Sequence, residues 1–163
     1  MNFVSSDEII PAEVWFQAIL PLLQEGYQLK ICPKGSSMVP FLTGDRDEAV
    51  LSAPPAGYLY KINDIVLFRL GSGPYVLHRI CRIDAGGIYT LGDGNTAFEG
   101  PFRPEDFLAI VDYIIRKGKV VKKDDKKYLL LVKMWRLIRP LRPLVLDGYS
   151  KFRRFERRIT KIR

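Results

Sequence analysis

Between residues 27 and 115 the chain is a series of short apolar runs separated by glycine, proline, asparagine and aspartate. Six runs have the length and the β-branched or aromatic content of strands, and no helical period separates one from the next. They are residues 27–31, 48–52, 64–70, 75–83, 87–91 and 107–115. The glycine-rich segments 71–73 and 85–87 are expected to form hairpin turns. This pattern predicts a compact, largely antiparallel sheet or barrel.

A helix is predicted on the N-terminal side of this β region. Residues 11–25 carry apolar side chains at helical spacing, with Pro11 suited to the first turn and Gly26 to the end. Pro21 is expected to kink or split the helix. We therefore expect a helical segment over residues 1–26 that covers one face of the β body.

The composition changes again after Gly118. Residues 122–163 interleave leucine, tryptophan and phenylalanine with many lysines and arginines, which predicts basic amphipathic helices. Four apolar residues of this tail fall on one helical face: Leu130, Met134, Leu137 and Leu141. The expected fold is mainly β, α+β overall, with a β domain over residues 27–121 and a helical tail over 122–163.

The charge is divided between these regions. Residues 1–115 hold 8 Lys/Arg and 14 Asp/Glu, a net charge of −6, whereas residues 116–163 hold 18 Lys/Arg and 4 Asp/Glu, a net charge of +14. Different partners are therefore expected for the two parts. An anionic membrane surface would suit the tail over residues 126–163. Packing of the tail on the body or on a partner is an alternative. Nucleic acid fits the charge, but no element that would read it is recognisable.

The rare residue types exclude several classes of site. The chain has two cysteines, Cys32 and Cys81, without metal-ligand spacing, and one histidine, so neither a zinc site nor another cofactor is expected. No apolar run approaches the roughly 18 residues that span a bilayer. The acidic N-terminus does not read as a secretory signal. We therefore expect a cytoplasmic protein, peripheral to the inner face of the membrane if the tail binds lipid.

Four motifs of the β region could carry chemistry. They are KGSSMVPFL at 34–42, NDIVLF at 63–68, VLHRI at 76–80 and LGDGN at 91–95. A serine hydroxyl needs a neighbouring base to become a good nucleophile, and His78 is the one histidine available. Taken singly, each motif is also explained by ordinary structure, as turn residues or a packed strand histidine.

In order and spacing, the four motifs resemble the conserved boxes of type I signal peptidases and the related repressor autoproteases. The resemblance covers about residues 30–112. It implies that Ser37, directly before the methionine, is the nucleophile. His78 stands where bacterial signal peptidases carry a lysine base, as in the endoplasmic-reticulum type. Asp93 matches the acid of the last box, and Glu99 is a second candidate acid.

The resemblance also implies roles around the nucleophile. The Ser37 backbone N–H, with the Ser36 hydroxyl as a further candidate, would bind the oxyanion. Gly35 and Pro40 would shape the loop, and Met38 with Pro40 would contact the substrate. A peptide substrate would bind in extended form beside the site as an added strand.

Three departures from the family pattern affect these expectations. Gly35 occupies the position at which signal peptidases often carry a hydroxyl, which weakens a side-chain contribution to the oxyanion site. Asn63 replaces a glycine, although asparagine tolerates the turn conformations that glycine adopts. Neither the N-terminal membrane anchor of signal peptidases nor the DNA reader of repressors is recognisable in the first 30 residues, and the basic tail is expected to replace the anchor.

The sequence therefore predicts a serine endopeptidase that removes a leader or signal segment from a peptide or protein. The alternative is a catalytically inactive relative that binds or escorts an extended peptide. A basic nucleic-acid-binding regulator is a third hypothesis, which rests on the tail alone.

Overall fold

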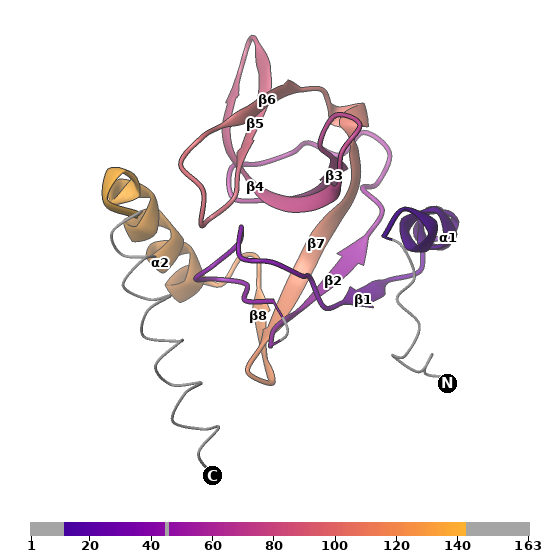
Figure 1. The fold of residues 1–163 in the computed structure, drawn as a ribbon, viewed down its shortest axis with the longest axis horizontal. Helices are drawn as coiled ribbons and strands as arrows, with labels where there is room; N and C mark the ends of the chain where they lie inside the picture. The colour runs from indigo at the N-terminus through magenta and orange to yellow at the C-terminus, as the bar shows by residue number, and fades with distance from the viewer. Residues whose placement is uncertain (1–11, 45, 143–163) are drawn as a thin grey trace.

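A computed structural model describes residues 12–44 and 46–142 of the chain, as an antiparallel β body with one helix on each side (Figure 1). The helices are α1 (Ala12–Gln24) and α2 (Lys126–Leu137), and two short 3₁₀ helices are η1 (Pro104–Asp106) and η2 (Arg139–Leu141). The strands are β1 (Leu29–Ile31), β2 (Glu48–Ser52), β3 (Ile65–Arg69), β4 (Tyr75–Asp84), β5 (Gly87–Leu91), β6 (Glu99–Phe102), β7 (Phe107–Arg116) and β8 (Lys119–Lys122).

These strands form one strongly curled antiparallel sheet in the order β1-β2-β7-β3-β4-β5-β6, with β8 added to β7 (Figure 1). The mainly β, α+β fold class is thus confirmed, and each of the six predicted runs contains a strand. Two strands were not predicted. β6 is short and contains Gly100 and Pro101, and β8 is a short segment with lysine at both ends.

The curled sheet encloses two apolar clusters. The larger one joins the loop after β1 to β2, β3, β4, β7 and both helices, and includes Met38, Leu67 and Leu77. The smaller one lies around Phe68, with Ile80 and Phe107. Because neighbouring residues of a strand face opposite sides, β4 contributes Leu77 to the first cluster and Ile80 to the second.

Helix α1 is not split at Pro21, and its end agrees with the prediction. It continues through Pro21 without a break, because a proline there removes a single backbone hydrogen bond. It ends as expected at Gly26, whose φ of 91° permits the bond from Tyr27 N to the Leu22 carbonyl oxygen at 3.0 Å. The buried face is formed by Ile19 and Leu23, with Leu22 on the exposed side.

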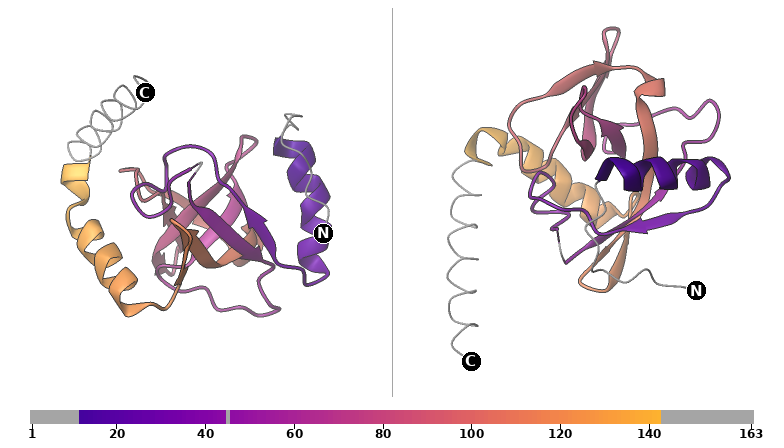
Figure 2. Two further views of the ribbon diagram at one scale, coloured as in Figure 1. Left: turned by 90° about the horizontal axis from the view of Figure 1, so that it is seen from below. Right: turned by 45° about the vertical axis from the view of Figure 1, so that its right-hand side comes forward.

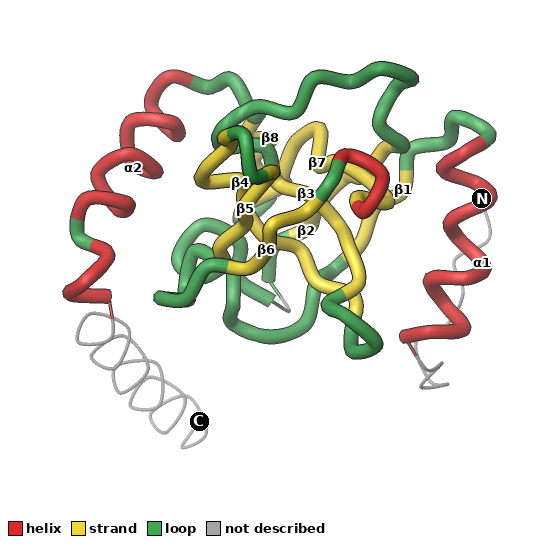
Figure 3. The backbone as a smooth tube through the Cα atoms, turned by 90° about the horizontal axis from the view of Figure 1, so that it is seen from above, coloured by secondary structure: helices red, strands yellow, loops and turns green. Residues whose placement is uncertain are grey.

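Helix α2 packs on the body with one face and presents the other to solvent. Tyr128 and Val132 are buried, and Asp125 caps the helix by accepting a hydrogen bond from Tyr128 N at 2.9 Å. The predicted apolar stripe is on the outer face, where its residues are exposed: Leu130 59%, Met134 57%, Leu137 75% and Leu141 53%. Figures 2 and 3 show α1 and α2 on opposite sides of the sheet.

The remainder of the predicted tail, residues 143–163, lies outside the described residues. In the part of the chain that the structure describes, neither helix has the length and apolar composition needed to cross a bilayer.

Candidate active site

Ser37 lies in the loop between β1 and β2. The residues that follow it anchor this loop in the core, because Met38, Phe41 and Leu42 are each at most 4% exposed. Leu42 N donates to the Met38 carbonyl oxygen at 2.9 Å. Gly35, with φ of 91°, turns the chain ahead of the serine. The core thus holds a half-buried serine at the edge of the body.

The LGDGN turn supports the serine loop from the other side. Gly94 N donates to the Ser37 carbonyl oxygen at 2.7 Å. A Cβ at Gly92 would lie 2.6 Å from that same oxygen, and a Cβ at Gly94 would lie 2.7 Å from the Ser36 carbonyl oxygen. Glycine is therefore required at both positions for the first and fourth motifs to meet.

His78 is buried on β4, with 3% of its surface exposed. Its Nδ1 lies 2.5 Å from Glu99 Oε2, and the Thr90 hydroxyl donates to that oxygen at 3.0 Å. Glu99 comes from β6 and pairs with Thr90 of β5. A carboxylate in this position fixes the orientation of the imidazole and favours the tautomer with the proton on Nδ1.

Asp93, which the sequence analysis chose as the acid for His78, pairs with Arg79 instead. Arg79 Nε and Nη2 donate to the two carboxylate oxygens at 2.9 and 2.7 Å, and both residues are buried. Burial alone would lower the pKa of Arg79, but the charge of Asp93 and the contact with Tyr128 raise it above its usual value. Successive side chains of a strand point to opposite faces, so a group bound to Arg79 faces away from His78. The carboxylate that contacts His78 in the structure is therefore that of Glu99.

The sheet register relates His78 to Ser37. Arg79 pairs with Leu91, and continuing this register by one residue sets His78 opposite Gly92. Residues directly opposite in an antiparallel pair point to the same face. The position from which Gly92 would project a Cβ is occupied by the Ser37 carbonyl oxygen, so the serine loop covers the face from which His78 projects. His78 Nε2 is buried and has no hydrogen-bond partner among the described residues, Ser37 included.

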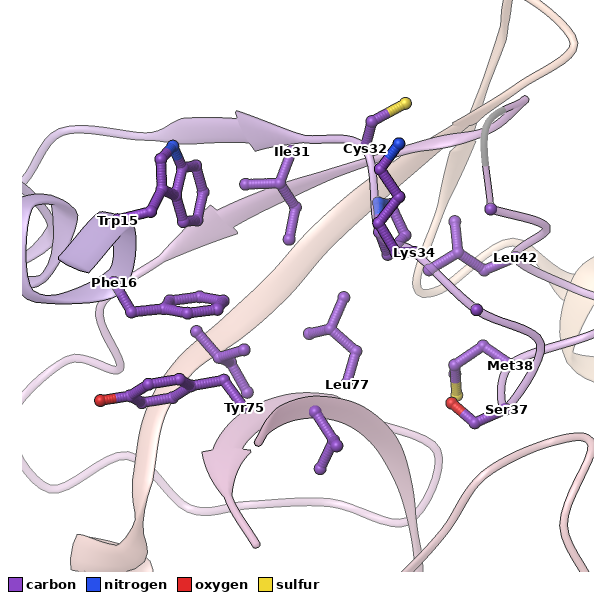
Figure 4. Close-up of a pocket in the computed structure, with 15 residues that line it drawn as sticks. Trp15, Phe16, Ile31, Cys32, Lys34, Ser37, Met38, Leu42, Tyr75 and Leu77 are labelled. Carbon is purple, nitrogen blue, oxygen red and sulfur yellow. The ribbon is translucent and has the colours of Figure 1, made fainter. Parts of the chain in front are cut away.

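Ser37 also lines a cavity of about 480 Å³ between the end of β1 with the loop after it and the start of β4 (Figure 4). One wall is the chain from Ile31 to Gly35, and the other is Tyr75–Leu77 of β4. Both walls have an open edge within the described residues. β1 pairs with β2 only, and β4 pairs with β5 only from Arg79 onward. The cavity thus has the shape of a slot that an extended peptide could fill by pairing with strand edges.

The other predicted contact residues divide between this slot and the loop behind it. Met38 and Gly35 line the cavity, whereas Ser36 and Pro40 are not part of its wall. Ser36 is exposed. Asn63, at the position of the family glycine, has φ of 80°, which confirms that asparagine adopts the turn conformation expected there.

Helix α2 contacts both the LGDGN turn and the serine loop, a role that the sequence did not indicate. Trp135 Nε1 donates to the Asp93 carbonyl oxygen at 2.6 Å, and Arg79 Nη2 donates to the Tyr128 hydroxyl at 2.7 Å. The rings of both aromatic residues also pack edge-on against Phe41 of the serine loop, with centroids 5.6 Å (Tyr128) and 6.5 Å (Trp135) away. The helix therefore contacts the LGDGN turn and the serine loop at once.

Comparison with models of protein families, with curated proteins and with solved structures found no match to this chain. Among the described residues, no group of three histidine, cysteine, aspartate or glutamate side chains is placed to hold a metal ion. The chemistry of the site therefore has to be derived from its own side chains.

Proposed function

We propose that this protein is a serine endopeptidase that removes a leader or signal segment from a peptide or protein. One observation carries the proposal: the buried imidazole of His78 is bound at Nδ1 by Glu99 and leaves Nε2 unpaired, on the face that the Ser37 loop covers. A base oriented by an acid and facing a hydroxyl is the arrangement that activates a serine.

In the proposed reaction, His78 Nε2 accepts the proton of Ser37 while the hydroxyl oxygen attacks the peptide carbonyl carbon. The Ser37 backbone N–H stabilises the developing oxyanion, with the Ser36 hydroxyl as a further donor. The carbon–nitrogen bond breaks, and His78 returns the proton to the leaving amine. Water, deprotonated by His78, then attacks the carbonyl carbon of the ester. The bond to the Ser37 oxygen breaks, the acyl part leaves as a carboxylic acid, and His78 returns the proton to the Ser37 oxygen. Glu99 stabilises the imidazolium formed in each half of the reaction.

Closure of the site on substrate is part of this proposal. His78 Nε2 makes no hydrogen bond to Ser37 in the structure, and in serine hydrolases such bonds often tighten only when substrate binds. A peptide that pairs with the edges of β1 and Tyr75–Leu77 would expel water and press the serine loop toward β4. With the peptide bound in this way, its scissile bond would lie at Ser37, and the peptide residues before that bond would lie in the slot.

The test is to incubate the purified full-length protein with a mixture of short synthetic peptides of random sequence and to identify cut products by mass spectrometry. We expect cleavage at positions with a shared sequence preference. A Ser72→Ala variant, changed in the exposed turn between β3 and β4, serves as the serine control and should cut the same peptides. If the wild-type protein cuts none of them but still binds a subset, the inactive peptide-binding alternative replaces the endopeptidase.

We further propose that the protein works on the cytoplasmic face of an anionic membrane. The outer face of α2 carries Leu130, Met134 and Leu137, with the exposed Lys127 on one side of this stripe and the exposed Lys126 and Lys133 on the other. A helix with an apolar stripe flanked by lysines lies in the interface of a bilayer. Each basic residue near an anionic surface contributes about 1 kcal/mol. The proposal extends to the basic residues of 143–163 on sequence grounds alone.

Replacing Leu130 and Leu137 together by serine should weaken binding to vesicles containing phosphatidylserine by about tenfold or more, because apolar area would no longer enter the bilayer. Co-sedimentation with vesicles measures the bound fraction. The difference between phosphatidylserine-containing and pure phosphatidylcholine vesicles gives the electrostatic contribution to binding. Leu59→Ser is the control, since Leu59 is 80% exposed in a loop remote from α2 in sequence. Equal binding of the double variant and the control would contradict docking through α2.

A further inference from the structure

The end of the slot that lies away from Ser37 is closed by three aromatic rings. Figure 4 shows Ser37 and Met38 at one end of the cavity and Trp15, Phe16 and Tyr75 at the other. Phe16 and Tyr75 lie with ring centroids 4.2 Å apart, and Trp15 meets Phe16 edge-on at 5.0 Å. Two of these rings come from α1, which is far from the serine loop in sequence.

Helix α1 is fixed to the body, so these rings form a constant part of the cavity wall. Leu23 and Ile19 are 1% and 8% exposed, and Leu23 belongs to the main apolar cluster. Phe16 and Trp15 pack against the same cluster and remain half-buried. Part of each ring therefore faces the cavity.

The cavity is larger than a small side chain requires, and its far end is lined by aromatic rings. A volume of about 480 Å³ falls in the range of sites that hold a sizeable ligand. In an extended peptide, alternate side chains point the same way at about 3.3 Å per residue. A peptide lying in the slot with its cut at Ser37 would thus place a side chain several residues away against the aromatic end. Aromatic rings bind flat or branched apolar groups best.

We propose that Trp15 and Phe16 of α1, with Tyr75 of β4, form a specificity pocket for a bulky apolar side chain of the substrate, several residues from the scissile bond. The occupant is phenylalanine, tyrosine, leucine, isoleucine or methionine in an extended segment. This inference rests on the proposed function in taking the peptide in the slot to be a substrate.

The test uses binding, so it does not depend on cleavage. Full-length protein carrying Ser37→Ala is immobilised and exposed to phage that display random peptides, and the bound pool is sequenced. We expect bulky apolar residues to be enriched at one position. Adding Phe16→Ala to this variant should lower its affinity for the best-binding synthetic peptide about tenfold and remove the enrichment. Adding Phe16→Trp, which fills the pocket, should move the preference to smaller residues such as valine.

The control on the same helix is Val14→Ala, because Val14 is 55% exposed and is not part of the cavity wall. It should leave affinity and enrichment unchanged. A bound pool without bulky apolar enrichment would overturn the proposal. So would Phe16→Ala and Phe16→Trp variants that bind like the control. Enrichment that persists although wild-type protein cuts no peptide would keep this pocket and reject the endopeptidase.

Discussion

Ser37→Ala and His78→Ala should each lower kcat on a cleaved peptide by a factor on the order of 10⁶, and the double variant should be no slower than either single one. The reason is that the two side chains act as one unit: without the base the hydroxyl is not a nucleophile, and without the hydroxyl the base has no proton to accept. The measurement is kcat for the three variants on one peptide identified from the random mixture.

The kcat of Glu99→Gln should lie between those of these variants and that of the wild type, lower than the wild-type value by a factor of about 10⁴. The amide would retain the size of the carboxylate but would present an N–H or a neutral oxygen to His78 Nδ1, so the imidazolium would lose its counter-charge. Glu48→Gln is the matched control, because Glu48 forms a surface ion pair with Lys30. Wild-type kcat in Glu99→Gln would show that another group orients the histidine.

Asp93→Asn should produce the largest loss of stability, about 3–5 kcal/mol, because it leaves the buried Arg79 guanidinium without a counter-charge. The hydrogen bonds from Arg79 to the Tyr128 hydroxyl and the Asn63 carbonyl oxygen would remain, but neither acceptor carries a full charge. Urea unfolding should show a lower midpoint with little change in m.

The control for this loss is Asp84→Asn, which breaks the exposed pair of Asp84 with Arg82 and should cost no more than about 1 kcal/mol. If Asp93→Asn were no less stable than Asp84→Asn but lost activity as Ser37→Ala does, Asp93 would be the catalytic acid after all, and the structural role assigned to it would be wrong.

The sequence predicted the β architecture because the strands alternate in hydrophobicity and are separated by strong turn residues. The resemblance of the ordered motifs singled out Ser37 and the LGDGN turn, and the contact between them is seen only in the structure. The strand β6 was missed, since Glu99, Gly100 and Pro101 have little β propensity and this segment forms a strand only by pairing with β5.

The sequence did not show whether Asp93 or Glu99 contacts His78. Both carboxylates follow His78 at plausible distances, and a strand-by-strand pattern does not say which face each one reaches. In the structure Arg79 pairs with Asp93 on one face of β4, and His78, on the other face, contacts Glu99 of the edge strand β6, which lies beyond β5.

The two helices show a second limit of sequence patterns. The apolar stripe of the tail was recognised, but the periodicity did not reveal that the opposite face, through Tyr128, Val132 and Trp135, packs on the serine loop and the LGDGN turn. Likewise, the sequence predicted only that the aromatic residues of α1 belong to a helix that covers one face of the β body. Their part in the cavity wall depends on how the helix is placed against β4, which is a tertiary contact.

The proposed reaction requires Ser37 to become covalently linked to the peptide during cleavage. The direct measurement is to mix excess protein with a cleavable peptide, stop the reaction in acid within the first turnover, and map adducts by mass spectrometry. We predict that the fragment containing Ser37 gains the mass of the acyl part of the peptide, through an ester absent from Ser37→Ala. Cleavage that proceeds at the wild-type rate in Ser37→Ala, or an adduct on any other residue, would contradict the account.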